Sequence, residues 1–290
     1  MHSITAKHIL SPRNGMNLYR GCQHGCIYCD ARSRCYGMDH DFTDIAVKEN
    51  GLKLLEEALR SRRRPCMIGT GAMSDPYMPL EEELELTRKS LELIEKYGFG
   101  ATVLTKSDRI LRDLDVLQRI NSSTKAVVQM TLTTMDDTMC RILEPNVSTT
   151  QQRIAALKIF QRVGIPTVVW LCPVLPFLND TEENIRGIVE ACAGANVRGI
   201  VHFGMGLTLR EGNREYFYQQ LDCHFPGLTE RYIRTYGNAY EILSPNAARL
   251  EQVFRECCDS YGICRDNDKI FTYLSAFEEK QTIHQLSLFD

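Results

Sequence analysis

Several features that would point to particular protein classes are missing from this 290-residue sequence. The charges nearly balance, with 34 Lys and Arg against 37 Asp and Glu, so the chain as a whole has no attraction for nucleic acid and would need a local basic patch to bind it. No apolar run reaches roughly the 18 residues of a membrane span, and no signal peptide is recognisable. Internal repeats and low-complexity segments are also absent. Together these absences predict a globular cytoplasmic protein that does not enter the membrane.

Cysteine, in contrast, is abundant. Twelve cysteines would suggest disulfides in a small secreted chain. Without a signal peptide, a reducing compartment with metal-bound and buried thiols is the better interpretation. Because hydrophobic residues make up 43% of the sequence, the chain can build a sizeable core. We therefore expect a folded, oxygen-sensitive protein that holds a metal group.

Three of these cysteines lie close together near the N-terminus. Cys22, Cys26 and Cys29 have the spacing C-x3-C-x2-C, and Tyr28 directly precedes the last of them. Three thiolates can ligate three irons of a [4Fe–4S] cluster and leave the fourth iron open to a small molecule. A structural zinc site would require a fourth ligand, and His24 is too near its neighbours in the loop to be a convincing one. The iron–sulfur interpretation is favoured, and zinc is the alternative.

Short runs rich in β-branched residues alternate with amphipathic segments over residues 1–203. This alternation predicts an α/β fold of six β–α units with right-handed crossovers, a partial (β/α)6 TIM-type barrel. The cysteine loop, 21–36, would follow the first strand. We expect strands at 17–20, 66–70, 101–105, 126–132, 167–172 and 199–203, and helices at 49–62, 80–97, 108–121, 149–163 and 181–193. Residues 204–283 are expected to form a mainly helical extension over the barrel mouth, and 284–290 a flexible tail.

The cysteine spacing resembles the signature of the radical S-adenosylmethionine (SAM) superfamily. Further short motifs resemble its spore photoproduct lyase branch. They are, in chain order, Cys26-Ile27-Tyr28-Cys29, Ser74-Asp75-Pro76, Thr105-Lys106-Ser107, Leu132-Thr133-Thr134 and Leu143-Glu144-Pro145. The resemblance implies that the open iron chelates SAM. One electron, from a donor such as flavodoxin or ferredoxin, would then cleave SAM to a 5′-deoxyadenosyl radical.

The resemblance also implies SAM contacts at the ends of the strands, where such barrels collect ligands. Tyr28 would pack near the adenine and Lys106 would pair with the SAM carboxylate, while hydroxyl and carboxylate groups would take the amino and ribose groups. Each motif has an ordinary alternative, since Ser-Asp before Pro is a common turn and Thr-Lys-Ser a common helix cap. The candidate SAM contacts are Tyr28, Ser74, Asp75, Lys106, Thr131 and Thr133.

Two positions depart from the lyase pattern. The lyases resemble one another in a cysteine just before the Ser-Asp step, a hydrogen donor to the product radical, where this chain has Ala72. They also carry a tyrosine after the third cluster cysteine, where this chain has Asp30. A substrate other than the spore photoproduct is therefore expected. Other residues could donate the hydrogen atom, although each could equally be an inert core residue. The candidates are Cys172, Tyr77 and Cys140.

The C-terminal extension interleaves arginines with tyrosines. Arginine for phosphate and aromatics for bases suit the recognition of a flipped or single-stranded base, but the same residues could form a packed polar cap. The loop 211–215 is expected to line the substrate cavity. The candidate substrate contacts are Arg210, Asn213, Arg214 and Tyr216. An auxiliary cluster is a less favoured possibility, because two of its four cysteines are adjacent; these are Cys223, Cys257, Cys258 and Cys264.

The end of the chain offers a separate clue. Residues 285–289 resemble the pentapeptide by which bacterial DNA-repair and replication proteins dock on the sliding clamp. The clamp contacts would be Gln285, Leu286, Leu288 and Phe289. Three functions remain open: a radical SAM enzyme acting on DNA as a repair lyase, a radical SAM enzyme that modifies a protein, peptide or RNA, and a non-catalytic iron–sulfur redox sensor that docks on the clamp.

Overall fold

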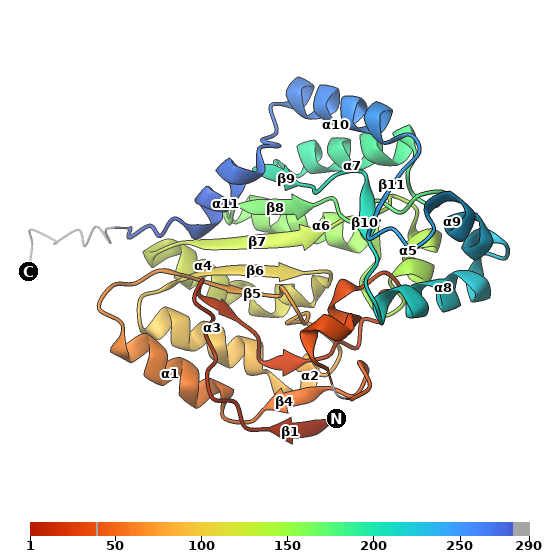
Figure 1. Ribbon diagram of the computed structural model, residues 1–290. Helices are drawn as coiled ribbons and strands as arrows, with labels where there is room; N and C mark the ends of the chain where they lie inside the picture. Colours follow the sequence, from red (N-terminus) through yellow and green to blue (C-terminus); the bar gives the residue numbers. More distant parts are fainter. Residues whose placement is uncertain (39, 281–290) are drawn as a thin grey trace, which may run out of the picture.

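A wholly parallel sheet of six strands forms the centre of the computed structural model, which describes residues 1–38 and 40–280 (Figure 1). The order of strands in the sheet follows their order in the chain, and its first and last strands are not paired with each other. The strands are β2 (Gly15–Met16), β5 (Met67–Thr70), β6 (Gly100–Thr105), β7 (Ala126–Thr131), β8 (Thr167–Trp170) and β9 (Gly199–Val201). The predicted partial six-stranded barrel is thereby confirmed.

Helices between successive strands cover the outer face of this sheet, as expected for right-handed β–α units. They are α1 (Gly51–Ser61), α3 (Leu86–Lys96), α4 (Leu114–Ser123), α6 (Thr150–Arg162) and α7 (Glu182–Gly194). In α3, Leu91 and Ile94 lie on one stripe and are buried. All six residues of β7 are buried, because a parallel strand in the middle of such a sheet is covered on both faces. A further helix, α5 (Asp137–Leu143), begins at an Asp136 cap.

Two predicted elements differ from the structure. The stretch 17–20 is not the first strand of the barrel; β3 (Tyr19–Arg20) instead pairs with β4 (Ala46–Lys48) in a separate small sheet with β1 (His2–Ile4). The helix expected at 80–97 is interrupted at Glu85, whose φ is +52°, so that α2 (Glu81–Leu84) is separate from α3. The buried Glu81 carboxylate accepts a hydrogen bond of 2.7 Å from the backbone of Thr87, which stabilises the break.

The C-terminal extension divides over three sides of the barrel. At the carboxyl ends of the strands lie β10 (Gly206–Thr208), its antiparallel partner β11 (Glu241–Leu243), α8 (Asn213–His224) and α9 (Leu228–Tyr236) (Figure 1). Helix α10 (Ala247–Tyr261) packs on α7, and α11 (Asn267–Ser275) packs on β9. Only the first part of the extension therefore lies at the mouth. Within the described ranges, no helix combines the length and apolar character needed to cross a bilayer.

Candidate active site

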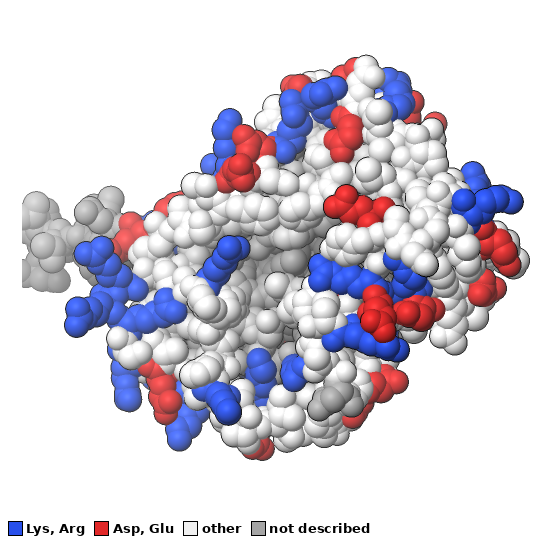
Figure 2. Space-filling view, in the orientation of Figure 1, with Lys and Arg blue, Asp and Glu red and all other residues white. Residues whose placement is uncertain are grey.

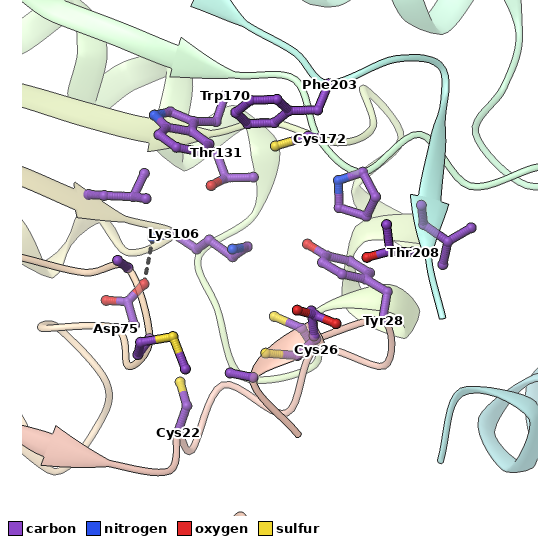
Figure 3. Close-up of a pocket in the computed structure, with 18 of the residues that line it drawn as sticks. Cys22, Cys26, Tyr28, Asp75, Lys106, Thr131, Trp170, Cys172, Phe203 and Thr208 are labelled. Carbon is purple, nitrogen blue, oxygen red and sulfur yellow. Dashed lines mark hydrogen bonds between the residues drawn. The ribbon is translucent and has the colours of Figure 1, made fainter. Parts of the chain in front are cut away.

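A cavity of about 650 Å³ lies at the carboxyl ends of the strands (Figure 3). The cysteine loop forms one wall, the segments that follow β5, β6, β8 and β9 form others, and β10 and β11 complete the lining. Residues far apart in the sequence meet here because the carboxyl ends of parallel strands share one edge of the sheet. The volume falls within the roughly 300–1,000 Å³ typical of sites for small ligands.

Most of the predicted cofactor contacts line this cavity. The structure brings together Cys22, Cys26, Tyr28, Cys29, Ser74, Asp75, Lys106, Thr131 and Cys172. Thr133 is buried outside the cavity, with its hydroxyl 3.4 Å from Glu144. The hydroxyl of Ser74 donates to the backbone carbonyl of Tyr19 at 3.1 Å. The individual contacts to SAM remain predictions, but the shared location of these side chains is a finding.

The three cysteines of the loop fit an iron–sulfur cluster better than a zinc ion. Their sulfur atoms do not all lie within 4.8 Å of one another. A tetrahedral zinc ion with Zn–S bonds of about 2.3 Å would hold its sulfurs only about 3.8 Å apart. Three thiols are also the number that a [4Fe–4S] cluster with one open iron requires. Burial raises the pKa of all three thiols, that of Cys22 to about 12, so binding of iron would displace their protons.

Lys106 supplies a free positive charge inside the cavity. Its side chain extends from the end of β6 toward the centre (Figure 3), and within the described residues its ammonium makes no hydrogen bond. Burial alone would lower the pKa of Lys106, but Cys26 and the carboxylates of Glu144 and Asp75 raise it above its ordinary value. The side chain is therefore charged at neutral pH, and it can pair with a carboxylate that enters the cavity.

Asp75 ties the walls of the cavity together. Its carboxylate accepts hydrogen bonds from the Thr105 hydroxyl (2.7 Å), the Lys106 backbone N–H (2.7 Å) and the Tyr77 backbone N–H (2.9 Å). The Nε2 atom of His24, in the cysteine loop, lies 3.2 Å from the same carboxylate. Burial would raise the pKa of Asp75, but these partners lower it below its ordinary value. The group is thus ionised and fully engaged, which favours a positioning role over a direct contact with SAM.

A buried ion pair holds the aromatic ring that precedes the third cysteine. The Tyr28 hydroxyl donates to Glu144, and Glu144 pairs with the fully buried Arg153. Arg153 also donates to the backbone carbonyl of Thr131 at 2.8 Å, at the end of β7. The ring of Tyr28 is therefore fixed against the strand ends. The motif Leu143-Glu144-Pro145 was already part of the family resemblance, but its partner Arg153 was missed.

Two of the three candidate hydrogen donors lie outside the cavity. The Tyr77 hydroxyl is buried and donates to Asp113 at 3.0 Å. The Cys140 sulfur is buried 3.0 Å from Arg153, where it is part of the ion-pair cluster. Only Cys172 faces the cavity, at the end of β8 (Figure 3). The sequence does not show whether a buried cysteine or tyrosine faces the cavity or the core, so it predicted all three residues as candidates.

The environment of Cys172 predicts how this thiol reacts. Burial raises its pKa to about 11, so little thiolate is present at neutral pH. Because the thiolate is the form that reacts, we expect alkylation by iodoacetamide to be slow at about pH 7.5 and to accelerate as the pH rises toward 11. Mass spectrometry of peptides from protein alkylated under anaerobic conditions would measure the rate, with the exposed Cys223 as the internal reference. Equal rates at the two cysteines near pH 7.5 would contradict this expectation.

The four predicted substrate contacts of the extension do not line the cavity. Arg210 donates to the Tyr240 hydroxyl at 2.8 Å, and its guanidinium lies 3.4 Å from the carboxylate of Asp30. Arg214 donates to the backbone carbonyl of Ala239 at 2.8 Å, and Asn213 is fully buried. These side chains organise the extension and join it to the cysteine loop. The spacing of arginines and tyrosines could not distinguish this packed arrangement from a binding surface.

The loop 211–215 packs on the cysteine loop. The ring of Tyr216 lies 3.8 Å from the guanidinium of Arg32, and the ring of Phe42 lies 4.4 Å away on the same cation. Gly212 has a φ of +92°, and an added Cβ would lie 3.1 Å from the backbone oxygen of Arg32. The positive φ and this close approach explain why position 212 is a glycine. The loop therefore packs on the cysteine loop and does not line this cavity, contrary to the prediction.

The structure lends no support to an auxiliary cluster. Cys257 and Cys258 are buried in α10, where they belong to the main hydrophobic core. Cys223 is exposed on α8, a different part of the extension. The amphipathic pattern of α10 already explains its two cysteines as core residues.

Several residues that line the cavity were not predicted. The aromatic side chains Trp170 and Phe203 lie at the ends of β8 and β9, and Tyr36 lies at the end of the cysteine loop. Gly71 follows β5 with a φ of +99°, and an added Cβ would lie only 1.9 Å from the backbone oxygen of Leu104. A side chain at that position would displace β6. Alternation along the strands could have suggested Trp170 and Phe203, since both end apolar runs.

Comparison with known proteins decides the family. The model of the radical SAM superfamily matches residues 16–192, from β2 into α7. This chain belongs to the radical SAM superfamily. The cofactors of the superfamily, a [4Fe–4S] cluster and SAM, fit the residues found here, because three cysteine thiols line one cavity with Lys106, whose charge is unpaired among the described residues. The predicted family and cofactors are confirmed.

Individual relatives define the relationship further. An uncharacterized protein of Mycobacterium tuberculosis is 31% identical over 232 residues, which are 77% of this chain and 67% of that protein. A radical SAM Nalpha-GlyT isomerase of Pseudomonas phage M6 is 23% identical over 180 residues, 62% of this chain and 36% of the isomerase. A spore photoproduct lyase variant, solved with AdoMet and dinucleoside spore photoproduct, superposes with a TM-score of 0.63 and 15% identity over 90% of this chain and 78% of that one. This last likeness shows a shared fold.

Proposed function

We propose that this radical SAM protein acts on DNA, with lyase-like repair chemistry at a lesion other than the spore photoproduct. When bound, the cluster and SAM supply a 5′-deoxyadenosyl radical that takes a hydrogen atom from the substrate. One observation carries the proposal: a single cavity joins the cluster cysteines and Lys106 to a free thiol and to aromatic side chains that the cofactors do not require.

The size of the cavity restricts the substrate. A volume of about 650 Å³ has room for SAM and a small reacting group, but not for a folded macromolecule. A macromolecular substrate must therefore insert a protruding part. An extruded nucleobase meets this requirement, as in other enzymes that perform chemistry on bases. The shared fold with a lyase solved with a dinucleoside photoproduct supports a nucleic-acid substrate.

The chain's own residues have distinct roles in this proposal. Lys106 would hold the carboxylate of SAM. The ion pair of Glu144 with Arg153 fixes the Tyr28 hydroxyl, and the Tyr28 ring would pack near the adenine. Asp75 holds the cysteine loop against the ends of β5 and β6. The extension closes one side of the cavity through β10 and β11 and limits the access of water.

We expect the lesion to differ from the spore photoproduct because the proposed hydrogen donor lies at a different position in the barrel. Ala72 lines the cavity after β5 and lacks the weak S–H bond of a thiol hydrogen donor, whereas Cys172 faces the cavity from β8. In this proposal the S–H bond of Cys172 breaks and a C–H bond forms on the substrate radical. The sulfur radical is then reduced by one electron and one proton, with the electron from the flavodoxin- or ferredoxin-type donor that the cofactor already needs.

The experiment that tests the function follows hydrogen transfer from DNA. Anaerobically reconstituted protein is reduced with dithionite and given SAM together with ultraviolet-irradiated DNA that contains deuterated thymidine. Mass spectrometry then measures 5′-deoxyadenosine and its deuterium content, with Cys26→Ala as the control that lacks a cluster ligand. Deuterium incorporation that depends on DNA and on Cys26 is expected.

Other outcomes would point to the remaining functions. Formation of 5′-deoxyadenosine without any deuterium from DNA would refute the DNA proposal and favour a protein, peptide or RNA substrate. If no 5′-deoxyadenosine formed from fully iron-loaded protein, with or without DNA, a redox sensor would be favoured over an enzyme. Docking on a sliding clamp stays a prediction, because Gln285, Leu286, Leu288 and Phe289 lie outside the described residues.

A further inference from the structure

We infer that Trp170, Phe203 and Phe271 form a stacking surface for one nucleobase at the edge of the cavity. These three side chains are called the aromatic platform below. The inference rests on the proposed function, since it names the group of the DNA substrate that the site would hold. It adds a binding site that neither the cysteine loop nor the SAM contacts explain.

The platform is assembled from three separate elements. Trp170 ends β8, Phe203 follows β9 and Phe271 belongs to α11. The ring centres lie 5.8 Å apart for Trp170 and Phe203, 5.9 Å for Trp170 and Phe271, and 6.3 Å for Phe203 and Phe271. Trp170 and Phe203 line the cavity directly, on the side where Cys172 lies (Figure 3). A base on this surface would therefore lie next to the proposed hydrogen donor.

Exposed apolar side chains concentrate at this cavity. The ring of Phe203 is 61% exposed, the highest value for an aromatic side chain among the described residues. Of the nine large apolar side chains that are exposed in this part of the chain, four line the cavity: Tyr36, Met73, Phe203 and Leu243. Single exposed apolar residues are ordinary, but a group around one concave site indicates a binding surface.

Buried polar contacts fix the orientation of the platform. The indole N–H of Trp170 donates to the side-chain carbonyl of Gln129 at 2.8 Å. The amide of Gln129 in turn donates to the hydroxyl of Thr102 at 2.7 Å, so one chain of hydrogen bonds crosses β8, β7 and β6. Helix α11 supports the platform from the amino ends of the strands through Ile270 and Leu274. A surface fixed in this way loses little entropy when it binds a planar ligand.

The charges around the platform favour a neutral planar group. Lys106 is the only Lys or Arg among the residues that line the cavity, and the cofactor accounts for it. Asp75 is engaged by His24 and Thr105, and Asp30 accepts from the Tyr36 hydroxyl at 2.8 Å. Glu241 also lines the cavity, and its carboxylate makes no hydrogen bond or ion pair among the described residues, so a cationic peptide side chain would find this one free carboxylate inside. Outside, Lys and Arg side chains lie at several places on the rim of the hollow, with Asp and Glu among them on its right-hand side (Figure 2), and a phosphate backbone would contact the basic side chains.

The composition of the chain provides a direct probe. Trp170 is its single tryptophan, so intrinsic fluorescence reports on the platform. The ligand is a fluorescein-labelled single-stranded thymidine oligonucleotide of about 12 nucleotides, and anisotropy gives its dissociation constant. We expect binding of the unlabelled oligonucleotide to quench Trp170. We expect Phe203→Ala to weaken binding about 10-fold or more, while Phe203→Tyr keeps binding within about threefold.

A matched control separates the platform from general surface effects. Tyr261 is 51% exposed on α10, away from the cavity lining, so Tyr261→Ala removes an exposed ring of similar size and should leave binding unchanged. Because Phe203 is mostly exposed, its replacement should not unfold the protein, which circular dichroism would verify. If Phe203→Ala bound the oligonucleotide as tightly as the unaltered protein, the platform would be refuted and the DNA proposal would stand.

The remaining outcomes keep the two proposals distinct. Normal binding with the expected Phe203 effect, but no deuterium transfer from DNA, would refute the proposed function and retain the platform as a base-binding surface. If the unaltered protein bound no oligonucleotide, and an aromatic peptide quenched Trp170 instead, the nucleobase assignment would be wrong.

Discussion

Replacing Lys106 with methionine is expected to weaken the binding of SAM by about 10- to 150-fold. This loss of affinity corresponds to the loss of one charge-assisted hydrogen bond, about 1.5–3 kcal/mol of binding free energy. The effect should be large because the ammonium is enclosed, carries its charge at neutral pH and has no hydrogen-bond partner among the described residues to keep it away from a ligand. Methionine has a similar length and leaves the cavity wall in place.

The measurement is equilibrium dialysis of labelled SAM against anaerobically reconstituted protein. Iron and sulfide content should be the same in Lys106→Met and the unaltered protein, because Lys106 is not a cluster ligand. Lys89→Met is the matched control, since Lys89 lies on the surface of α3 and donates only to the backbone carbonyl of Leu84. Unchanged affinity in Lys106→Met with a full cluster would show that SAM binds without this lysine.

Arg153→Met is expected to lower the free energy of unfolding by about 3–5 kcal/mol, because it leaves the buried carboxylate of Glu144 without its cation. Arg153 also donates 2.8 Å hydrogen bonds to the backbone carbonyls of Thr131 and Ser148, and these acceptors would lose their partner. Urea or guanidinium unfolding, followed by circular dichroism on metal-free protein, would measure the change.

A double variant distinguishes the buried charge from lost packing. Glu144→Gln combined with Arg153→Met removes both charges, so it should be more stable than Arg153→Met alone. Arg162→Met is the control, since Arg162 is an exposed residue at the end of the same helix. A loss of stability in Arg153→Met no greater than that in Arg162→Met would contradict the proposed importance of the pair.

Local features of the sequence were sufficient for the family and the outline of the fold. The spacing of Cys22, Cys26 and Cys29 is short enough that the loop alone dictates their proximity. The alternation of apolar and amphipathic runs follows from the periods of strands and helices, so five of the six barrel strands were placed correctly, although their ends shifted by a few residues. The position of Lys106 in the cavity followed from the rule that parallel strands present their carboxyl ends together.

Only the tertiary structure decided which residues share the site. Tyr77 and Cys140 have the right chemistry for hydrogen donors, but packing buries them behind the cavity. Arg210 and its neighbours hold the cysteine loop. The sequence cannot show this because the two segments are far apart in the chain: Arg210 and Cys35, which are in contact, are separated by 175 residues.

The same reason applies to the aromatic platform. Phe203 and Phe271 come from different elements, and their rings meet only after α11 has packed on β9. A pattern along the chain reports the period of an element and the face that it buries. It does not report which distant element covers that face, since this is determined by shape and by the pairing of buried polar groups in the folded protein.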